Sequence, residues 1–356
     1  MRLTTRIILL IALATALPAR AQSPLFDFHS AFWINLHHYL HALARPRGLQ
    51  DALPGPATEA EREAWAAAVA VYRERYGKRS LLFDEELVRV KLALIAAESR
   101  EPNGLPEAMR TALASAAPVY RRHFWPAHDA SNRRTIADAG QLVARHGHAI
   151  ATRLAASYGA MWPSPALRVD FVPDAGPPGN AYTTNDPTHI TIAAVDSRHS
   201  GLHLLELLFH EASHGWDATL MREVAAAASE QKVRAPRDLW HALLFYNAGA
   251  ITTDVLATAG VSDYQMYADK EGLFTRPWPF RPAIAKHWSA FLAGRITRHE
   301  AIGRIVNEVK TPPKEEWPRS RNPPASADEG APVDLSSGFG SSITCHSSRR
   351  LPCFLH

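Results

Sequence analysis

The stretch LLELLFHEASHG, residues 204–215, determines how the rest of this chain is interpreted. It predicts an apolar helix that ends at the glycine and carries an H-E-x-x-H pattern. Residues four apart share one helical face, so His210 and His214 can present two imidazoles to one metal ion. Glu211 is turned about 100° away from His210 and can contact a metal-bound water. The stretch therefore predicts a zinc site, against the alternative of a chance match in an ordinary core.

Catalytic zinc takes three protein ligands and a water, so the site needs one more ligand. His241 lies near the start of a strongly apolar helix, on the face that also carries Phe245. It is the preferred third ligand, with an ordinary core histidine as the alternative interpretation. Glu230, in a stretch typical of a solvated helix end, and Glu223, only nine residues after His214, are the other candidates.

Other histidines fit a metal site less well. His203 shares a helical face with His210, but it lies about 10 Å away along the helix axis, too far for bonds of about 2.1 Å to one ion. We expect His203 and His199 at the helix start or on the surface. His37 and His41 also have four-residue spacing, but no acid stands between them and no glycine follows, which favours packing roles.

The motif and the alternating strand before it resemble the zincin metallopeptidases of an exported bacterial type, and more loosely their gluzincin branch. The resemblance covers residues 167–257 at its broadest. It implies that His210 and His214 bind one Zn²⁺, that Glu211 is the general base, and that the substrate is a peptide or protein. The metzincin extension is absent, because Asp217 and Leu220 stand at its glycine and last histidine positions. The later glutamate motif of gluzincins is not cleanly present.

Peptide hydrolysis would follow from such a site. Zinc lowers the pKa of a bound water towards about 7 and polarises the scissile carbonyl. Glu211 would take the proton of that water and pass it to the leaving amine. In zincins a tyrosine or histidine often stabilises the oxyanion. Tyr267 is preferred for this role over Tyr246 and Tyr264.

Two further features would support the site. A ligating histidine needs an acceptor for its other ring nitrogen, and Asp217, Asp238 and Asp254 are available. The predicted strand 189–194 either closes the sheet or is an edge strand that pairs with an extended substrate peptide.

The first 21 residues have the pattern of a secretory signal. Arg2 and Arg6 precede an apolar run of 11 residues, 7–17, and an A-x-A cleavage site ends at Ala21. The run is shorter than the roughly 20 residues that span a bilayer, although a retained N-terminal anchor is the alternative. We expect an exported protein, periplasmic or secreted, without stable membrane insertion after cleavage.

Charge and cysteine content exclude other functions. The formal net charge of +4 falls to +1 when the three arginines of the signal are removed, which gives no argument for nucleic acid as a partner. The two cysteines, Cys345 and Cys353, both lie close to the C-terminus. They brace little of a core, so the fold is not a disulfide scaffold and the chemistry is not thiol chemistry.

The periodicity predicts a mainly helical α+β protein, with a helical region 22–160, a zincin-like region 161–310 and a disordered Pro/Ser/Gly-rich tail 311–356. The expected helices are 30–44, 58–76, 84–98, 106–124 with a break or kink at Pro118, 135–158, 201–215, 218–232, 238–257, 282–293 and 297–309. The expected strands are 167–171, 181–183 and 189–194.

The sequence favours an exported zinc metallopeptidase. A non-catalytic envelope binding protein with a structural or degenerate zinc site is the alternative from another class. A zinc hydrolase that acts on a non-peptide bond is a third possibility.

Overall fold

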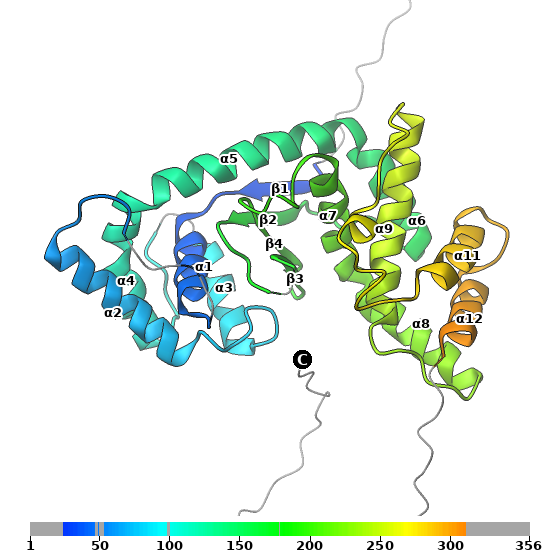
Figure 1. The fold of residues 1–356 in the computed structure, drawn as a ribbon, viewed down its shortest axis with the longest axis horizontal. Coiled ribbons are helices and arrows are strands. Elements are labelled where there is room, and N and C mark those ends of the chain that lie inside the picture. Colours follow the sequence, from blue (N-terminus) through cyan, green and yellow to red (C-terminus); the bar gives the residue numbers. More distant parts are fainter. Residues whose placement is uncertain (1–23, 47–48, 50–52, 98–99, 178, 311–356) are drawn as a thin grey trace, which may run out of the picture. The chain divides into compact units, whose positions relative to one another are not determined.

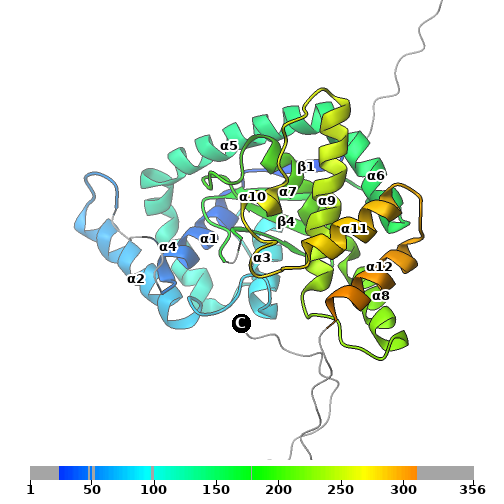
Figure 2. The same ribbon diagram turned by 45° about the vertical axis from the view of Figure 1, so that its right-hand side comes forward.

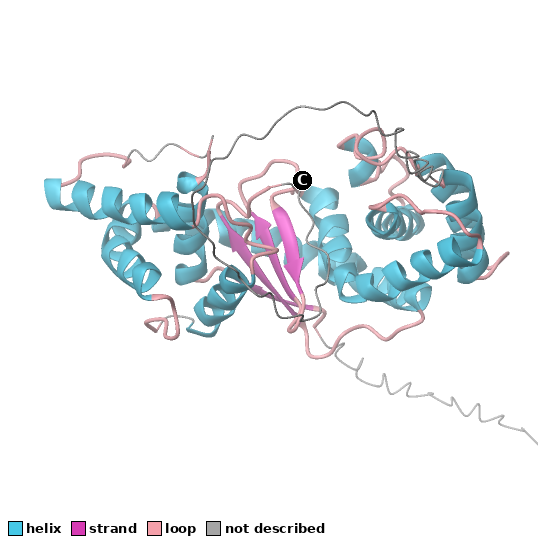
Figure 3. Cartoon of the chain, turned by 90° about the horizontal axis from the view of Figure 1, so that it is seen from below, coloured by secondary structure: helices cyan, strands magenta, loops and turns pink. Residues whose placement is uncertain are grey.

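A four-stranded mixed sheet lies between two groups of helices (Figure 3). Its strands, in spatial order, are β1 (Phe26–His29), β2 (Leu167–Val172), β4 (His189–Ala193) and β3 (Ala181–Thr184). β1, β2 and β4 run parallel, and β3 pairs antiparallel with β4. β3 is therefore an edge strand, whereas β4 is paired on both sides.

The computed structural model describes residues 24–46, 49, 53–97, 100–177 and 179–310 (Figure 1). The predicted signal segment 1–21 and the predicted disordered tail 311–356, with both cysteines, lie outside the described residues. None of the described helices combines the length and the apolar character needed to cross a membrane.

The helices before β2 are α1 (Phe32–Ala44), α2 (Glu59–Arg75), α3 (Glu85–Ala97), α4 (Glu107–His123), α5 (Trp125–Leu142) and α6 (His148–Tyr158), with a π-helical turn, Val143–Gly147, between the last two. The helices after β4 are α7 (Gly201–Ser213), α8 (Asp217–Glu230), α9 (Leu239–Thr258), α10 (Tyr267–Lys270), α11 (Arg281–Leu292) and α12 (Arg298–Val309), with a 3₁₀ turn, His214–Trp216, between α7 and α8. The fold class is confirmed as mainly helical α+β.

α4 has nearly the predicted bounds and continues through Pro118 without a break. The predicted start of the next helix was wrong. α5 begins at Trp125, ten residues before the predicted start, with Pro126 in its first turn. The first turn tolerates proline because its N–H groups have no partner within the helix.

Side chains alternate between the two faces of the sheet, and each face is buried in a different hydrophobic core. Val169, Phe171 and Ile190 face the core formed with α5, α6, α7, α8, α9, α11 and α12. Val172 and Tyr182 face the core formed with α1, α2, α3 and α4. Both groups of helices therefore pack against the sheet, one group on each face.

Candidate metal centre

Three histidines from two helices meet at one point. His210 lies in the last turn of the apolar helix α7, His214 follows that helix as the first residue of the 3₁₀ turn, and His241 lies in the first turn of α9. α7 and α9 pack side by side (Figure 2). One ligand nitrogen from each of the three histidines lies within 4.8 Å of the other two. The structure thus brings together the three residues that the sequence selected as ligands.

The chemical state of this cluster suits a metal ion. Burial, and the neighbouring histidines, lower the pKa of His210 well below its usual value, and burial also lowers the pKa of His241. Both rings are therefore neutral, which metal ligation requires. His210 Nδ1 and His241 Nε2 are buried without a hydrogen-bond partner among the described residues. Three imidazoles are a donor set that suits zinc.

Glu211 is held against the sheet beside the cluster. Only 4% of this residue is exposed. The Thr183 hydroxyl lies 2.7 Å from Glu211 Oε2, to which it can donate, and 2.9 Å from the Glu211 carbonyl oxygen. Burial raises the pKa of the Glu211 carboxyl, while the charge of His214 and the Thr183 hydroxyl act in the opposite direction. A carboxyl with a raised pKa is a suitable proton carrier.

Thr183 belongs to the edge strand β3, which corrects one prediction. The strand 189–194 was considered as the edge strand that could pair with substrate, but β4 lies inside the sheet between β2 and β3. The free edge beside Glu211 is that of β3, which runs antiparallel to β4. Alternation in sequence reveals strands but not their order, so this assignment required the tertiary structure.

Aromatic rings surround the histidines. The Phe245 ring stacks on His210 with a centroid distance of 3.5 Å and an interplanar angle of 15°. The ring centroid of Trp278 lies 4.8 Å from that of His241, and Trp240 stacks on the same histidine at 5.0 Å. Such rings exclude water and strengthen electrostatic interactions at the cluster. No pattern in the sequence pointed to Trp278, which lies in the loop after α10.

One of three candidate aspartates lies beside a ligand. Asp217 Oδ2 is 3.6 Å from His214 Nδ1. Asp254 instead pairs with Arg153 at 2.8 Å, and Asp238 immediately precedes α9. Asp217 is therefore the aspartate placed to orient His214.

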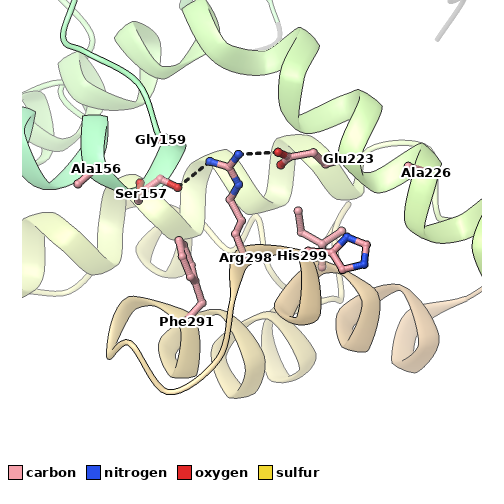
Figure 4. Close-up of a pocket in the computed structure, with 9 residues that line it drawn as sticks. Ala156, Ser157, Gly159, Glu223, Ala226, Phe291, Arg298 and His299 are labelled. Carbon is pink, nitrogen blue, oxygen red and sulfur yellow. Dashed lines mark hydrogen bonds and ion pairs between the residues drawn. The ribbon is translucent and has the colours of Figure 1, made fainter.

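The two alternative glutamate ligands lie in ion pairs instead. Arg298 donates to Glu223 Oε1 at 2.6 Å and to the carbonyl oxygen of Ser157 at 3.0 Å, as Figure 4 shows. A Glu230 carboxylate oxygen lies 3.6 Å from the ring of His299. Neither glutamate belongs to the group of ligand atoms around His210.

Of the three candidate tyrosines, Tyr267 contacts a residue that packs on the cluster. Its ring stacks on Phe245 with a centroid distance of 6.2 Å and an interplanar angle of 9°, and Phe245 stacks on His210. Burial raises the pKa of Tyr267 to about 12, although the charge of Arg198 acts in the opposite direction. The Tyr246 hydroxyl instead bonds Ser289 at 2.9 Å.

The remaining histidines are not part of the cluster. His203 bonds the Gln265 carbonyl oxygen at 2.9 Å on the surface, as expected. His199 lies just before the start of α7, one of the two expected places, but it is buried and not on the surface. Its Nδ1 bonds the Ala193 carbonyl oxygen at 3.2 Å, and its Nε2 lies 3.4 Å from the Tyr267 hydroxyl. His37 is buried and bonds the Tyr72 hydroxyl, which is a packing role.

Comparison of the chain with protein-family models, with curated proteins and with solved structures finds no match. The chemistry proposed for this protein therefore depends on the residues of the cluster and their surroundings.

Proposed function

We propose that this protein is an exported zinc-dependent metallopeptidase. The observation that carries the proposal is the convergence of His210, His214 and His241 beside the buried carboxyl of Glu211. Export is proposed from the signal-like segment 1–21 alone. The family proposed is a zincin of gluzincin-like type, from the H-E-x-x-H helix and the antiparallel edge strand that contacts its glutamate.

Each residue has a role in this proposal. The three histidines would hold one Zn²⁺, which when bound supplies a nucleophilic water and polarises the scissile carbonyl. Glu211 would accept a proton from the water and pass it to the departing amine. The Tyr267 O–H, which lies 3.4 Å from His199 Nε2, would turn to donate to the carbonyl oxygen as negative charge develops on it. The free edge of β3 can align an extended peptide through main-chain hydrogen bonds.

Glu211→Gln tests the catalytic role. We expect the variant to keep its zinc, measured by elemental analysis, and to lose at least 100-fold in the hydrolysis of unfolded casein, because the amide cannot carry the proton. Glu230→Gln is the matched control, since this exposed residue lies outside the cluster, and it should retain full activity. Unchanged hydrolysis in Glu211→Gln would contradict the peptidase mechanism. If the wild-type protein hydrolyses esters but not peptides, the result would favour a zinc hydrolase that acts on a non-peptide bond.

His241→Ala tests the third ligand. We expect a sharp fall in bound zinc per chain, because two imidazoles alone do not make a catalytic zinc site. Retention of a full equivalent of zinc would remove His241 from the ligand set. If zinc binding requires all three histidines but the wild-type protein hydrolyses neither casein nor esters, the result would support a binding protein with a structural ion.

A further inference from the structure

Glu206 is a buried acid that the catalytic proposal does not use. It lies on α7 one turn before His210, between leucines, and no part of it is exposed. Burying a carboxyl is costly unless it is hydrogen-bonded. One of its oxygens, Oε2, accepts two hydrogen bonds, from the Tyr264 hydroxyl at 2.5 Å and from the Tyr267 N–H at 3.1 Å. Glu206 therefore ties the chain after α9 to the helix of the metal cluster.

The residue tied down most completely is Tyr267. Its N–H is bonded by Glu206, its ring stacks on Phe245, and its hydroxyl lies 3.4 Å from His199 Nε2. Phe245 in turn stacks on His210. Backbone, ring and hydroxyl are thus each held by a different neighbour, which is more than simple packing of a tyrosine requires.

The facing helix has a glycine where Glu206 approaches it. A Cβ on Gly249 of α9 would lie 3.0 Å from Glu206 Oε1 and 2.9 Å from the sulfur of Met266. Both distances are too short for a side chain unless the Glu206 carboxyl and the Met266 side chain shift. The close approach of α9 is therefore matched to the carboxyl and to the segment that the carboxyl holds.

We propose that Glu206 is a positioning residue, which holds the Tyr267 backbone so that the ring stays on Phe245, beside the histidine cluster, and the hydroxyl can turn from His199 to the reacting carbonyl. This inference rests on the proposed peptidase function. Glu206 does not touch substrate and acts through Tyr267. A tyrosine whose backbone and ring are already fixed needs only a rotation of its hydroxyl to stabilise developing charge, so little reorganisation is required during the reaction.

Hydrogen exchange tests the clamp without any need for activity. In Glu206→Leu, which suits the apolar helix but removes the acceptor, we expect the Tyr267 amide to exchange at least 10-fold faster, with unchanged zinc content. Glu206→Gln, whose amide oxygen can still accept, should restore most of the protection. Tyr246→Phe is the control that removes a tyrosine hydroxyl bond elsewhere on α9, and it should leave this amide unchanged. Unaltered exchange in Glu206→Leu would overturn the proposal.

A double-mutant cycle separates positioning from general stabilisation. We expect Glu206→Leu to lower kcat about as much as Tyr267→Phe does, with little change in KM. The double variant should lose no more than Tyr267→Phe alone. Losses that multiply would show that Glu206 acts independently of Tyr267 and would overturn the proposal.

Two outcomes need separate treatment. If Glu206→Leu does not fold, Gly249→Ala should give the same accelerated exchange and kcat loss, because its methyl group displaces the carboxyl. A wild-type exchange rate of the Tyr267 amide and a wild-type kcat in Gly249→Ala would overturn the proposal.

If the wild-type protein hydrolyses no peptide, the proposed function fails and the catalytic role of Glu206 fails with it. The exchange experiment still decides whether the clamp on Tyr267 exists.

Discussion

Each clustered histidine is held by different neighbours. In the proposed site these neighbours would affect the affinity for zinc. His210 lies against Phe245, and His241 lies between two tryptophans. His214 has Asp217 near its Nδ1. An acceptor on one ring nitrogen fixes the orientation of the ring and makes the other nitrogen a better ligand. In the proposed zinc site, Asp217 would therefore be the residue that orients His214.

Asp217→Asn should weaken zinc binding about 10- to 100-fold, because the charged partner of His214 is lost. Competition with a chromophoric chelator measures this change. Asp254→Asn, at an ion pair with Arg153, is the control and should bind zinc normally. Normal affinity in Asp217→Asn would mean that the 3.6 Å approach to His214 has no role in binding.

Glu206 should make stability depend on pH. Burial raises the pKa of its carboxyl from 4.5 to about 7. A raised pKa means that the folded protein keeps the proton more firmly than the unfolded chain. The stabilisation is complete below about pH 4.5 and is lost as pH rises through about 7. The shift corresponds to an upper limit of about 3 kcal/mol.

Thermal unfolding of Glu206→Gln at pH 5 and pH 8 measures this effect. The difference between the unfolding midpoints, variant minus wild type, should be larger at pH 8 than at pH 5. The reason is that Glu206 ionises in the wild type as pH rises, whereas glutamine does not. A difference between the two proteins that stays constant with pH would contradict a raised pKa for Glu206.

At the scale of elements, β3 connects the two cores. Thr183 contacts Glu211 on one face of the strand. On the other face, the Tyr182 hydroxyl bonds His38 at 3.0 Å, and Lys91 of α3 donates to Thr184 at 2.5 Å. The helical region thus reaches the candidate site through a strand of four residues.

Lys91 should add a second pH dependence. Burial lowers the pKa of this lysine from 10.5 to about 7. Between these values the unfolded chain carries the proton and the folded chain does not, so stability rises with pH and is lost again as pH falls through about 7. Compared with Lys91→Met, the wild type should gain stability between pH 7 and pH 10, with an upper limit of about 5 kcal/mol. Urea unfolding at both pH values measures the gain, and parallel curves would contradict the prediction.

The periodicity of the sequence predicted most helices and strands, but it did not predict the tertiary contacts between them. The helix over 201–215 and the strands near 167, 181 and 189 follow from periodicity, which depends on neighbouring residues. The strand order, and hence the role of Thr183, depends on pairing between distant segments. Glu206 was not predicted as a functional residue, because its partners Tyr264 and Tyr267 lie about sixty residues away. His241 could be selected only because the predicted zinc site needed a third ligand. Without that requirement, a histidine in an apolar helix would be interpreted as an ordinary core residue.

At the scale of the whole molecule, an ion held by α7 and α9 would join segments that are distant in sequence. A ligand that binds only the folded state stabilises it, by about 2.7 kcal/mol at 100 times its dissociation constant. Removal of zinc with a chelator should therefore lower the midpoint of thermal unfolding by several degrees, and added zinc should restore it. In His241→Ala the chelator should have a much smaller effect. An equal shift in both proteins would place the stabilising ion elsewhere.

The alternation of β3 also limits how this chain can evolve. Its neighbouring residues serve opposite layers, so insertion or deletion of one residue within the strand would turn Tyr182 or Thr184 towards α7 in place of Thr183. A change of two residues would preserve which residues face each way. Natural relatives of this protein should therefore carry length changes in the turn 185–188 rather than within residues 181–184.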